Sequence, residues 1–275
     1  MDLVRERPGT WVQHPGGTVA NVAALAARLG ADVALAGGAG DDEWGAWLRD
    51  GLAADGVGLH WFGLVPGART PVAFVTVAED GQPAYDVLGQ DLATLPAELP
   101  DAVDACDALF VGSNTLVAEA EATLAARERA LEREQPVVVD VNLRLGRWPT
   151  AARAAAATRE LLPGAFLVRC NANEGEVLTG EADPAAAAES LVAAGARHAV
   201  VTLGADGALL RGGGLRLDAP GVPAEVVDTS GAGDVFTAVL LTRLAASRFY
   251  PATLAAALPE AVERAARACE RFGAR

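Results

Sequence analysis

The residues with the clearest capacity for chemistry form the stretch Asp228-Thr-Ser-Gly-Ala-Gly-Asp234, which leads directly into an apolar segment. Small residues let backbone N–H groups approach an anion closely, and the positive end of a helix strengthens that binding. Gly231, Ala232 and Gly233 therefore predict a cradle for a phosphate group. Asp234, in the first helical turn beside that anion, can take a proton from an attacking hydroxyl. The alternative is an ordinary helix start in which Asp234 only complements the helix dipole.

Two further stretches favour a binding site over an ordinary turn. Gly16 and Gly17 permit a bend before a predicted helix, and Asn21 in that helix offers one donor and one acceptor, which suits a polyol. Asn171 and Glu174 follow a predicted strand. Ligands gather at the carboxyl ends of strands in open α/β sheets. The alternative for this second stretch is a capping box that only starts a helix.

The elements that must position these residues alternate between short β-branched runs and longer Ala/Leu/Arg stretches. This alternation predicts βαβ units with a mostly parallel sheet, hence an α/β fold in one domain over residues 1–275. The predicted strands are Asp32–Ala36, Ala108–Val111, Val137–Val141, Phe166–Arg169 and Ala199–Thr202. The predicted helices are Val19–Leu29, Ala118–Glu134, Thr150–Leu162, Pro184–Ala194, Ala232–Ala246 and Ala252–Arg271.

One region, residues 59–90, breaks the alternation. It contains turns at Pro66-Gly67 and Asp80-Gly81 and two or three predicted strands, of which Pro71–Val77 is the clearest. A small β excursion of this kind inside an α/β domain is typical of an edge extension or of a lid over a site.

Composition excludes several classes of function. The chain has 275 residues and a net charge of -14, which argues against a nucleic-acid partner. It has no long uninterrupted apolar run, so we expect no membrane span, and its first residues are unlike a signal peptide. Its 3 widely spaced cysteines suit a reducing, cytoplasmic compartment. The chain contains no lysine, which excludes a Walker lysine or a Schiff base.

Several of these motifs together resemble the PfkB/ribokinase carbohydrate kinase family, and its fructokinase-like branch in particular. The resemblance extends over nearly the whole chain. It rests on stretches whose order and spacing match that family, namely Gly16–Asn21, Gly38–Gly45, Gly112–Leu116, Asp140–Trp148, Asn171–Gly180, Asp228–Asp234 and Arg271–Ala274. It implies a ribokinase-like three-layer fold with a small β lid, and an ATP-dependent transfer of the γ-phosphate to a sugar hydroxyl, with fructose or a related ketose as the favoured acceptor.

The resemblance also implies a role for each matching residue. Asp234 would be the base, and Gly231, Ala232 and Gly233 the anion hole. The residues on the sugar side would be Asp2, Gly16, Gly17 and Asn21, with Asn142 and Arg144 near substrate and phosphate. The residues on the nucleotide side would be Asn171, Glu174, Thr202, Gly204 and Gly207. Glu174 would help to hold Mg²⁺ through phosphate or water, and Asp228 and Thr229 fall where some members bind a monovalent cation such as K⁺. A homodimer through the lid stays open.

Alternative functions on the same scaffold remain, because one fold hosts several activities. They are a 2-keto-3-deoxygluconate kinase, a nucleoside kinase, and a non-catalytic sensor of sugars or nucleotides. The intact Gly-Ala-Gly loop with Asp234 favours an enzyme over a sensor.

The sequence departs from the family at its beginning, because the strand that members place before the residue matching Asp2 is missing. Losing an internal strand would leave backbone groups unpaired and apolar side chains exposed. We therefore expect that the natural protein begins about ten residues upstream, and that the chain as given is less stable or less active.

Overall fold

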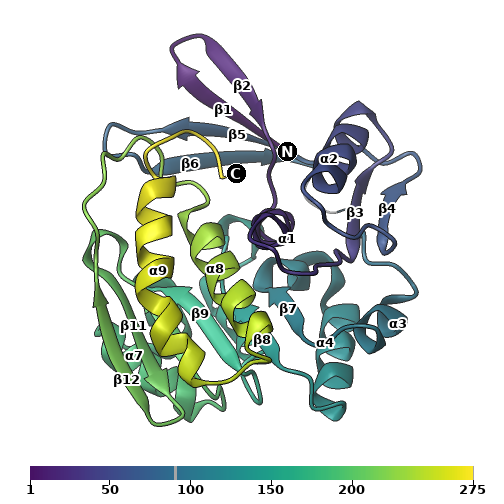
Figure 1. The fold of residues 1–275 in the computed structure, drawn as a ribbon. Coiled ribbons are helices and arrows are strands. Elements are labelled where there is room, and N and C mark those ends of the chain that lie inside the picture. The colour runs from purple at the N-terminus through teal and green to yellow at the C-terminus, as the bar shows by residue number, and fades with distance from the viewer. Residues whose placement is uncertain (90–91, 275) are drawn as a thin grey trace. The chain divides into compact units, whose positions relative to one another are not determined.

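The computed structural model describes residues 1–89 and 92–274 and divides into two units, which we treat one at a time (Figure 1). Unit 1 comprises Met1–Ala97, Pro223–Ala246 and Glu263–Arg275, and unit 2 comprises Glu98–Val222 and Ser247–Val262. Each unit therefore combines separate segments of the chain. Residue 90, the last of the predicted β excursion, lies outside the described residues.

Unit 2 is built on a six-stranded sheet with the order β12-β11-β10-β9-β8-β7. Its strands are β7 (Leu109–Gly112), β8 (Val137–Asp140), β9 (Leu167–Asn171), β10 (Ala199–Thr202), β11 (Gly207–Gly212) and β12 (Leu215–Pro220). The first four run parallel, and β11 and β12 form an antiparallel hairpin beside β10. Val137, Val138 and Val139 are fully buried, as expected for a parallel strand covered on both faces. The predicted mostly parallel sheet is confirmed.

The helices of unit 2 follow its strands. They are α3 (Leu99–Asp104), α4 (Leu116–Glu132), α5 (Ala151–Arg159), α6 (Ala172–Thr179), α7 (Pro184–Ala193) and the first part of α9 (Ala252–Ala268), with short 3-10 turns at Ser113–Thr115, Leu145–Arg147 and Gly204–Asp206. α4 packs on β7 and β8, and α7 packs on β10 and β11. The predicted helices α4, α5, α7 and α9 are confirmed within three residues at each end. The short helix α3 was not predicted, and α6 was foreseen only as the helix that a capping box at Asn171 would start.

The described residues of unit 1 form two sheets and three complete helices. Its elements are β1 (Asp2–Arg7), β2 (Thr10–His14), α1 (Thr18–Arg28), β3 (Gly37–Gly40), α2 (Glu43–Ala54), β4 (Phe62–Val65), β5 (Val72–Val77), β6 (Pro83–Leu88) and α8 (Ala232–Ala246). One sheet has the order β2-β1-β5-β6, and we call it the lid sheet after its predicted role. In the other sheet, β3 pairs in parallel with β4. Within this unit α1 packs against α8. The strands β4, β5 and β6 lie between residues 59 and 90, where the β excursion was predicted, and its role as a lid stays a prediction.

The lid sheet is larger than the sequence indicated, because residues 2–14 add the hairpin β1–β2 to it. Val4 in β1 is buried, and the terminal amine of Met1 donates to the carbonyl of Pro71. Asp2 therefore has a strand of its own beside β5. The expectation of a further strand upstream stays a prediction. Within the described residues, β7 pairs with β8 alone and β3 with β4 alone.

The predicted strand Asp32–Ala36 is wrong. That segment carries a single bridge between Ala34 and Gly58, and the strand forms afterwards, at Gly37–Gly40. A run of glycines has low strand propensity, but close packing requires it here. A Cβ on Gly38 would lie 2.3 Å from the carbonyl oxygen of Gly63, and one on Gly40 would lie 2.4 Å from the amide of Thr70. Tertiary contact thus overrides propensity.

Candidate active site

The loop before α8 in unit 1 carries the predicted base and anion hole. Asp228 is fully buried, and its two carboxylate oxygens accept from the amides of Ser230 at 2.8 Å and Gly273 at 3.0 Å. The chain then turns at Gly231, where φ is +75°, and α8 begins at Ala232. The amide of Ala232 donates to the carbonyl of Thr229 at 3.3 Å, and that of Val235 to the carbonyl of Gly231 at 2.9 Å. The start of α8 therefore offers an anion mainly the positive end of the helix dipole. This arrangement can bind a phosphate.

Asp234 lies in the first turn of α8 and is buried, with 9% of its surface exposed. Its Oδ2 accepts a hydrogen bond of 2.9 Å from the Nδ2 of Asn21 on α1, which is itself buried. The Oδ1 of Asn21 is also buried, and it has no hydrogen-bond partner among the described residues. A buried acceptor without a donor is costly, so this oxygen is suited to a hydroxyl supplied by a ligand. The packing of α1 on α8 thus joins two residues predicted independently.

Asp2, Gly16 and Gly17 lie at the entrance to α1 in the same unit. A Cβ on Gly16 would fall 2.1 Å from the Oδ1 of Asp2, so only glycine lets the carboxylate approach this backbone so closely. Gly17 is the N-cap of α1 with φ +96°, and the amide of Asn21 donates to its carbonyl. The structure therefore brings the predicted sugar-side residues of unit 1 to one end of α1, one helical turn from Asn21.

Asn171 and Glu174 form the capping box that was the alternative to a ligand site. The amide of Glu174 donates to Asn171 Oδ1 at 2.9 Å, and Glu174 Oε2 accepts from the amide of Asn171 at 2.9 Å. The other oxygen, Oε1, accepts from the amide of Leu143 at 2.8 Å. Burial raises the pKa of Glu174, Arg169 opposes this shift, and Asp140 adds to it. Because both oxygens already accept backbone hydrogen bonds, contact with a metal through water or phosphate fits Glu174 better than direct ligation.

The remaining predicted residues of unit 2 lie near the carboxyl ends of its parallel strands. Asn142 follows β8 with φ +30°, and its carbonyl accepts from the amide nitrogen of Asn114 at 2.9 Å. Arg144 is exposed and close enough to Glu174 to lower its pKa. Gly204 and Gly207 follow Thr202 with φ of +61° and +101°, and they shape the turn into β11. The parallel topology accounts for this gathering, because such strands end at one edge of the sheet.

A buried ion pair beneath these residues was not predicted. Arg169 in β9 places NH1 3.3 Å from Asp140 Oδ1 and donates from NH2 to Thr202 Oγ1 at 2.8 Å. Asp140 has no exposed surface. Burial lowers the pKa of Arg169, but Asp140 and Glu174 outweigh that effect and raise it. The pair ties together the ends of β8, β9 and β10. An arginine between Val168 and Cys170, in an otherwise apolar strand, is the signal that could have revealed it.

The side chains proposed for a monovalent cation have protein partners. Both oxygens of Asp228 accept amide hydrogen bonds, and the amide and hydroxyl of Thr229 donate to the carbonyl of Gly81 at 2.9 Å and 3.1 Å. Thr229 therefore joins the loop of residues 228–231, which we call the phosphate loop after its predicted role, to the turn between β5 and β6. In residues 1–89 and 92–274 no group of three or more His, Cys, Asp or Glu side chains is arranged to hold a metal ion.

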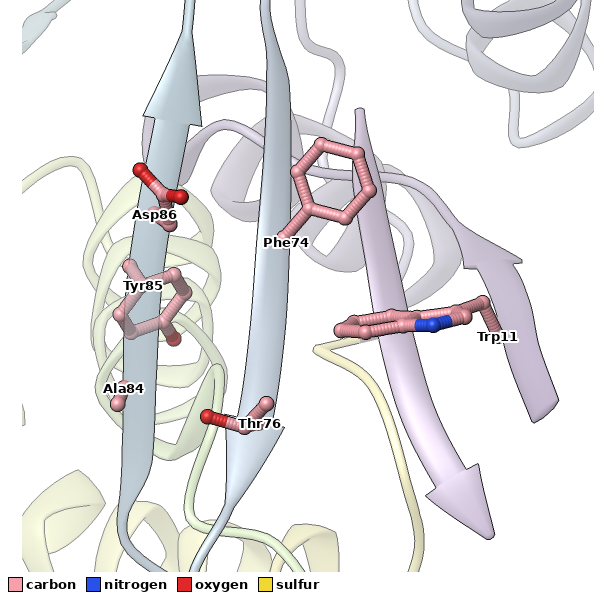
Figure 2. Close-up of a pocket in the computed structure, with 6 residues that line it drawn as sticks. All are labelled: Trp11, Phe74, Thr76, Ala84, Tyr85 and Asp86. Atoms are coloured by element: carbon pink, nitrogen blue, oxygen red, sulfur yellow. The ribbon is translucent and has the colours of Figure 1, made fainter. Parts of the chain in front are cut away.

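The lid sheet carries a hollow of about 510 Å³ that contains none of the predicted site residues (Figure 2). Trp11 and Phe74 lie in it with their rings nearly perpendicular and their centroids 5.5 Å apart. Side chains alternate between the faces of a strand, so Phe74 and Asp86 lie opposite the face of Val75 and Tyr85. The hydroxyl of Tyr85 instead donates to Ser230 in the phosphate loop at 3.2 Å. Tyr85 also lines the hollow, so this side chain borders both the hollow and the loop that carries the predicted anion hole.

Comparison with solved structures supports the fold. Aminoimidazole riboside kinase from Salmonella enterica, in complex with aminoimidazole riboside and an ATP analogue, has a TM-score of 0.84 and 29% identity, over 99% of this chain and 91% of that one. Fructokinase from Vibrio cholerae with bound fructose, ADP and calcium has a TM-score of 0.83 and 27% identity, over 99% and 91%. These similarities confirm the predicted ribokinase-like α/β fold.

Among curated proteins, this chain is similar in sequence to the same two kinds of kinase. Fructokinase-2 of Solanum lycopersicum is 35% identical over 246 residues, which cover 87% of this chain and 75% of the relative. Aminoimidazole riboside kinase of Salmonella typhimurium is 31% identical over 270 residues, which cover 96% and 83%. The sequence model of the pfkB family carbohydrate kinases matches residues 2–275. The chain therefore belongs to the pfkB family of carbohydrate kinases, phosphotransferases that act on an alcohol group.

Proposed function

We propose that this chain transfers the γ-phosphate of ATP to a hydroxyl of fructose or of a related ketose, with Asp234 as the general base. The observation that carries the proposal is the buried pair of Asp234 and Asn21, 2.9 Å apart in the first turns of two packed helices. The side-chain amide of Asn21 fixes one carboxylate oxygen of Asp234, and this would orient the carboxylate to deprotonate a hydroxyl. A base held in this way supports proton transfer without spending free energy on its own ordering.

Unit 1 would also bind the acceptor. The unsatisfied Oδ1 of Asn21 suits a sugar hydroxyl as donor, and Asp2 lies against Gly16 at the same end of α1. These groups offer carboxylate and amide acceptors to a polyol, whose several hydroxyl donors match them. The amides at the start of α8, after Gly231, would stabilise charge on the transferring phosphate. Phosphoryl transfer depends mainly on such positioning and on charge stabilisation.

Unit 2 would contribute the nucleotide residues. Asn142, Asn171, Thr202 and the turn glycines Gly204 and Gly207 lie near the carboxyl ends of its strands, where ligands of α/β sheets bind. Mg²⁺ would supply neutralisation of the phosphate charges, and Glu174 is our candidate to hold its hydration shell. The solved relatives include complexes with ADP and calcium, with ADP and potassium, and with ATP and magnesium. A K⁺ ion near Asp228 and Thr229 remains part of the proposal.

The choice of fructose over a riboside follows from the fructokinase-like stretches at Gly112–Leu116 and Asp140–Trp148 and from the identity to plant fructokinases. The second candidate is a riboside, because aminoimidazole riboside kinase is similar over a larger share of this chain. A 2-keto-3-deoxygluconate kinase is the third, since the acceptor residues named here recognise hydroxyls and not a particular ring. All three candidates share the proposed base and anion hole.

The decisive experiment measures ADP release over a panel of hexoses, ketoses, 2-keto-3-deoxygluconate and ribosides, with Mg²⁺ and with excess EDTA. We expect the highest kcat/KM for fructose or another ketose, and loss of turnover in EDTA because the phosphate charges are no longer neutralised. A higher kcat/KM for aminoimidazole riboside or adenosine than for every sugar would overturn the choice of acceptor. Absence of ADP release on all acceptors would overturn the kinase proposal.

We also propose a homodimer through the lid and a cytoplasmic location. Trp11 is 42% exposed and Leu88 58% exposed on the outer side of the lid sheet, where Arg5 and Asp86 offer opposite charges to a second copy. The expected result is a dimer by light scattering that Trp11→Ala converts to a monomer, and a monomeric parent chain contradicts it.

In the described parts of the chain no helix is long and apolar enough to cross a membrane. The three cysteines are free thiols, as a reducing compartment allows.

A further inference from the structure

The C-terminal tail, Arg271 to Ala274, contacts both the phosphate loop and the lid of unit 1. Phe272 packs against the core of the lid sheet formed by Val4, Ala73 and Val75. Figure 1 shows this last part of the chain, in yellow, running beside β5 and β6 after α9. Phe272 approaches the sheet on the face of Val75, which is opposite the hollow around Trp11 and Phe74. The tail thus lies under the inner face of the lid.

The next two residues reach the phosphate loop. The amide of Gly273 donates to Asp228 Oδ2 at 3.0 Å, while the other carboxylate oxygen accepts from the amide of Ser230 at 2.8 Å. Ala274 is buried and sits against Gly231, because a Cβ on Gly231 would fall 2.3 Å from the Cβ of Ala274. The loop residue that precedes the helix amides is therefore packed directly against the tail.

Position 273 accommodates only glycine. Its φ is +85°, and a Cβ would lie 2.3 Å from Nδ1 of His14, the last residue of β2. His14 in turn is 2.8 Å from Glu6 of β1. One short segment therefore contacts the hairpin β1–β2, the lid core and the phosphate loop. Glycine is needed at position 273 because a Cβ there would collide with His14.

The phosphate loop depends on such outside contacts for its shape. The amides of Val227 and Asp228 donate to the carbonyl of Cys269, at the end of α9, at 2.8 Å and 3.1 Å. Thr229 donates to Gly81 in the lid turn, and Ser230 accepts from Tyr85. The loop is thus held between the lid and the chain that follows α9, and a displacement of the tail would be transmitted to Gly231.

We propose that Phe272, Gly273 and Ala274 are positioning residues, which hold the anion-binding loop at Gly231 and the inner face of the lid in one arrangement. This inference rests on the proposed function, and it adds residues that are not among those proposed to bind the sugar or the nucleotide. A loop displaced by a fraction of an ångström loses alignment with charge that develops in the transition state. Disturbing the tail should therefore lower kcat and weaken sugar binding under the lid, while nucleotide binding by the residues of unit 2 stays unchanged.

The test compares Gly273→Ala with Gly9→Ala. Both glycines have positive φ, +85° and +78°, and both lie in unit 1, but a Cβ on Gly9 would meet nothing within 4 Å. The two variants thus share the same backbone strain and differ in contact. We expect Gly273→Ala to lower kcat by about tenfold to a hundredfold, the scale of a misplaced reacting group. Gly9→Ala should stay within about twofold of the parent, because it changes no contact.

Two readouts separate positioning from general destabilisation. ADP affinity, measured by calorimetry, should stay within about twofold in Gly273→Ala, while amide hydrogen exchange in residues 228–234 should become faster. If Gly273→Ala does not fold, Phe272→Ala is judged by the same two readouts. Adding His14→Ala to Gly273→Ala removes the steric part of the defect and should restore part of kcat.

The proposal is wrong if exchange in residues 228–234 is unchanged, if kcat is unchanged, or if ADP affinity falls as much as kcat. The last result would show that the tail serves stability alone. Should the parent phosphorylate none of the acceptors, the proposed function fails, but the exchange measurement still decides whether the tail positions the loop. The two failures are therefore distinguishable.

Discussion

The two units hold their site residues by different means. In unit 2, Asn142, Asn171 and Thr202 follow strands that are neighbours in one parallel sheet, and the buried pair of Arg169 and Asp140 fastens the strand ends. In unit 1, the pair of Asn21 and Asp234 joins helices whose contacting residues are 213 positions apart in the sequence. The residues proposed to bind the nucleotide are thus arranged by sheet topology, whereas those proposed to bind the acceptor are arranged by helix packing and by contacts with the sheet β2-β1-β5-β6 and the tail.

This difference has an energetic consequence. Site residues of unit 2 are part of the framework, because Glu174 caps α6 and Arg169 crosses three strands. Changing them should cost stability first and activity second. Asp234 and Asn21 contribute one hydrogen bond to each other, and Asn21 keeps a buried oxygen without a partner. Groups of this kind are kept for function at some cost to stability, so changing them should cost activity first.

The largest expected effect is that of Asp234→Asn. The substitution keeps the shape and a hydrogen-bonding group next to Asn21, so we expect a folded protein with unchanged nucleotide affinity. Loss of a positioned base should lower kcat by about 10²–10⁴-fold. Steady-state kinetics on the best acceptor measure this, and Asp50→Asn, on the exposed side of α2, is the matched control. A kcat within a few-fold of the parent would remove Asp234 from the mechanism and weaken the contrast between the units.

Arg169→Met is the matching experiment in unit 2, where the cost should appear as stability. Removing the arginine leaves Asp140 as a buried charge with its guanidinium partner lost, which typically costs about 3–5 kcal/mol. The control is Arg216→Met, since Arg216 pairs with Glu189 at the surface and exposed pairs contribute about 0–1 kcal/mol. Urea unfolding of both variants gives the two values. Equal losses would show that the pair at Arg169 is not a structural fastening.

The sequence predicted unit 2 better than unit 1, and the reason is physical. Buried parallel strands such as Val137–Asp140 are short apolar runs with a clear boundary, and polar residues at their ends mark the ligand-binding edge. In unit 1 the deciding contacts are between distant segments. No local pattern shows that Gly37–Gly40 is a strand, because its glycines serve close approach to Gly63 and Thr70.

For the candidate site, too, local motifs could be predicted from the sequence, whereas contacts between distant segments could not. Asp234 and Gly231 stand in a local motif, and the structure adds that Asn21 contacts Asp234. The capping box of Asn171 and Glu174 was foreseen as an alternative and is present. The hairpin β1–β2 and the role of the tail were not foreseen, because both depend on which small residues and strands meet in space. The functional roles of these residues stay predictions.

The smallest expected effect concerns pH, and it compares a helix-capping carboxylate in each unit. Burial raises the pKa of Glu174 above its ordinary value of 4.5, while Arg169 opposes and Asp140 adds to the shift. The folded state then holds this proton more tightly than the unfolded state, so the contribution of Glu174 to the free energy of unfolding falls as pH rises from about 4.5 through the folded pKa. For Asp42, burial acts upward but hydrogen bonds from Thr70 and Gly45 prevail and lower its pKa below 3.8. Its contribution is present above pH 3.8 and is lost as pH falls through the folded pKa.

Glu174→Gln and Asp42→Asn therefore change the pH dependence of stability with opposite signs. The unfolding free energy of the parent minus that of Glu174→Gln should fall as pH rises, by on the order of 1 kcal/mol for each unit of pKa shift. The difference between parent and Asp42→Asn should grow with rising pH up to the ordinary aspartate pKa, and by less, since Asp42 lies nearer to solvent. Urea unfolding from pH 3 to pH 7 measures both curves. Slopes of the same sign would show that Glu174 and Asp42 do not lie in opposite electrostatic environments. The contrast between the buried carboxylate of unit 2 and the more exposed one of unit 1 would then be wrong.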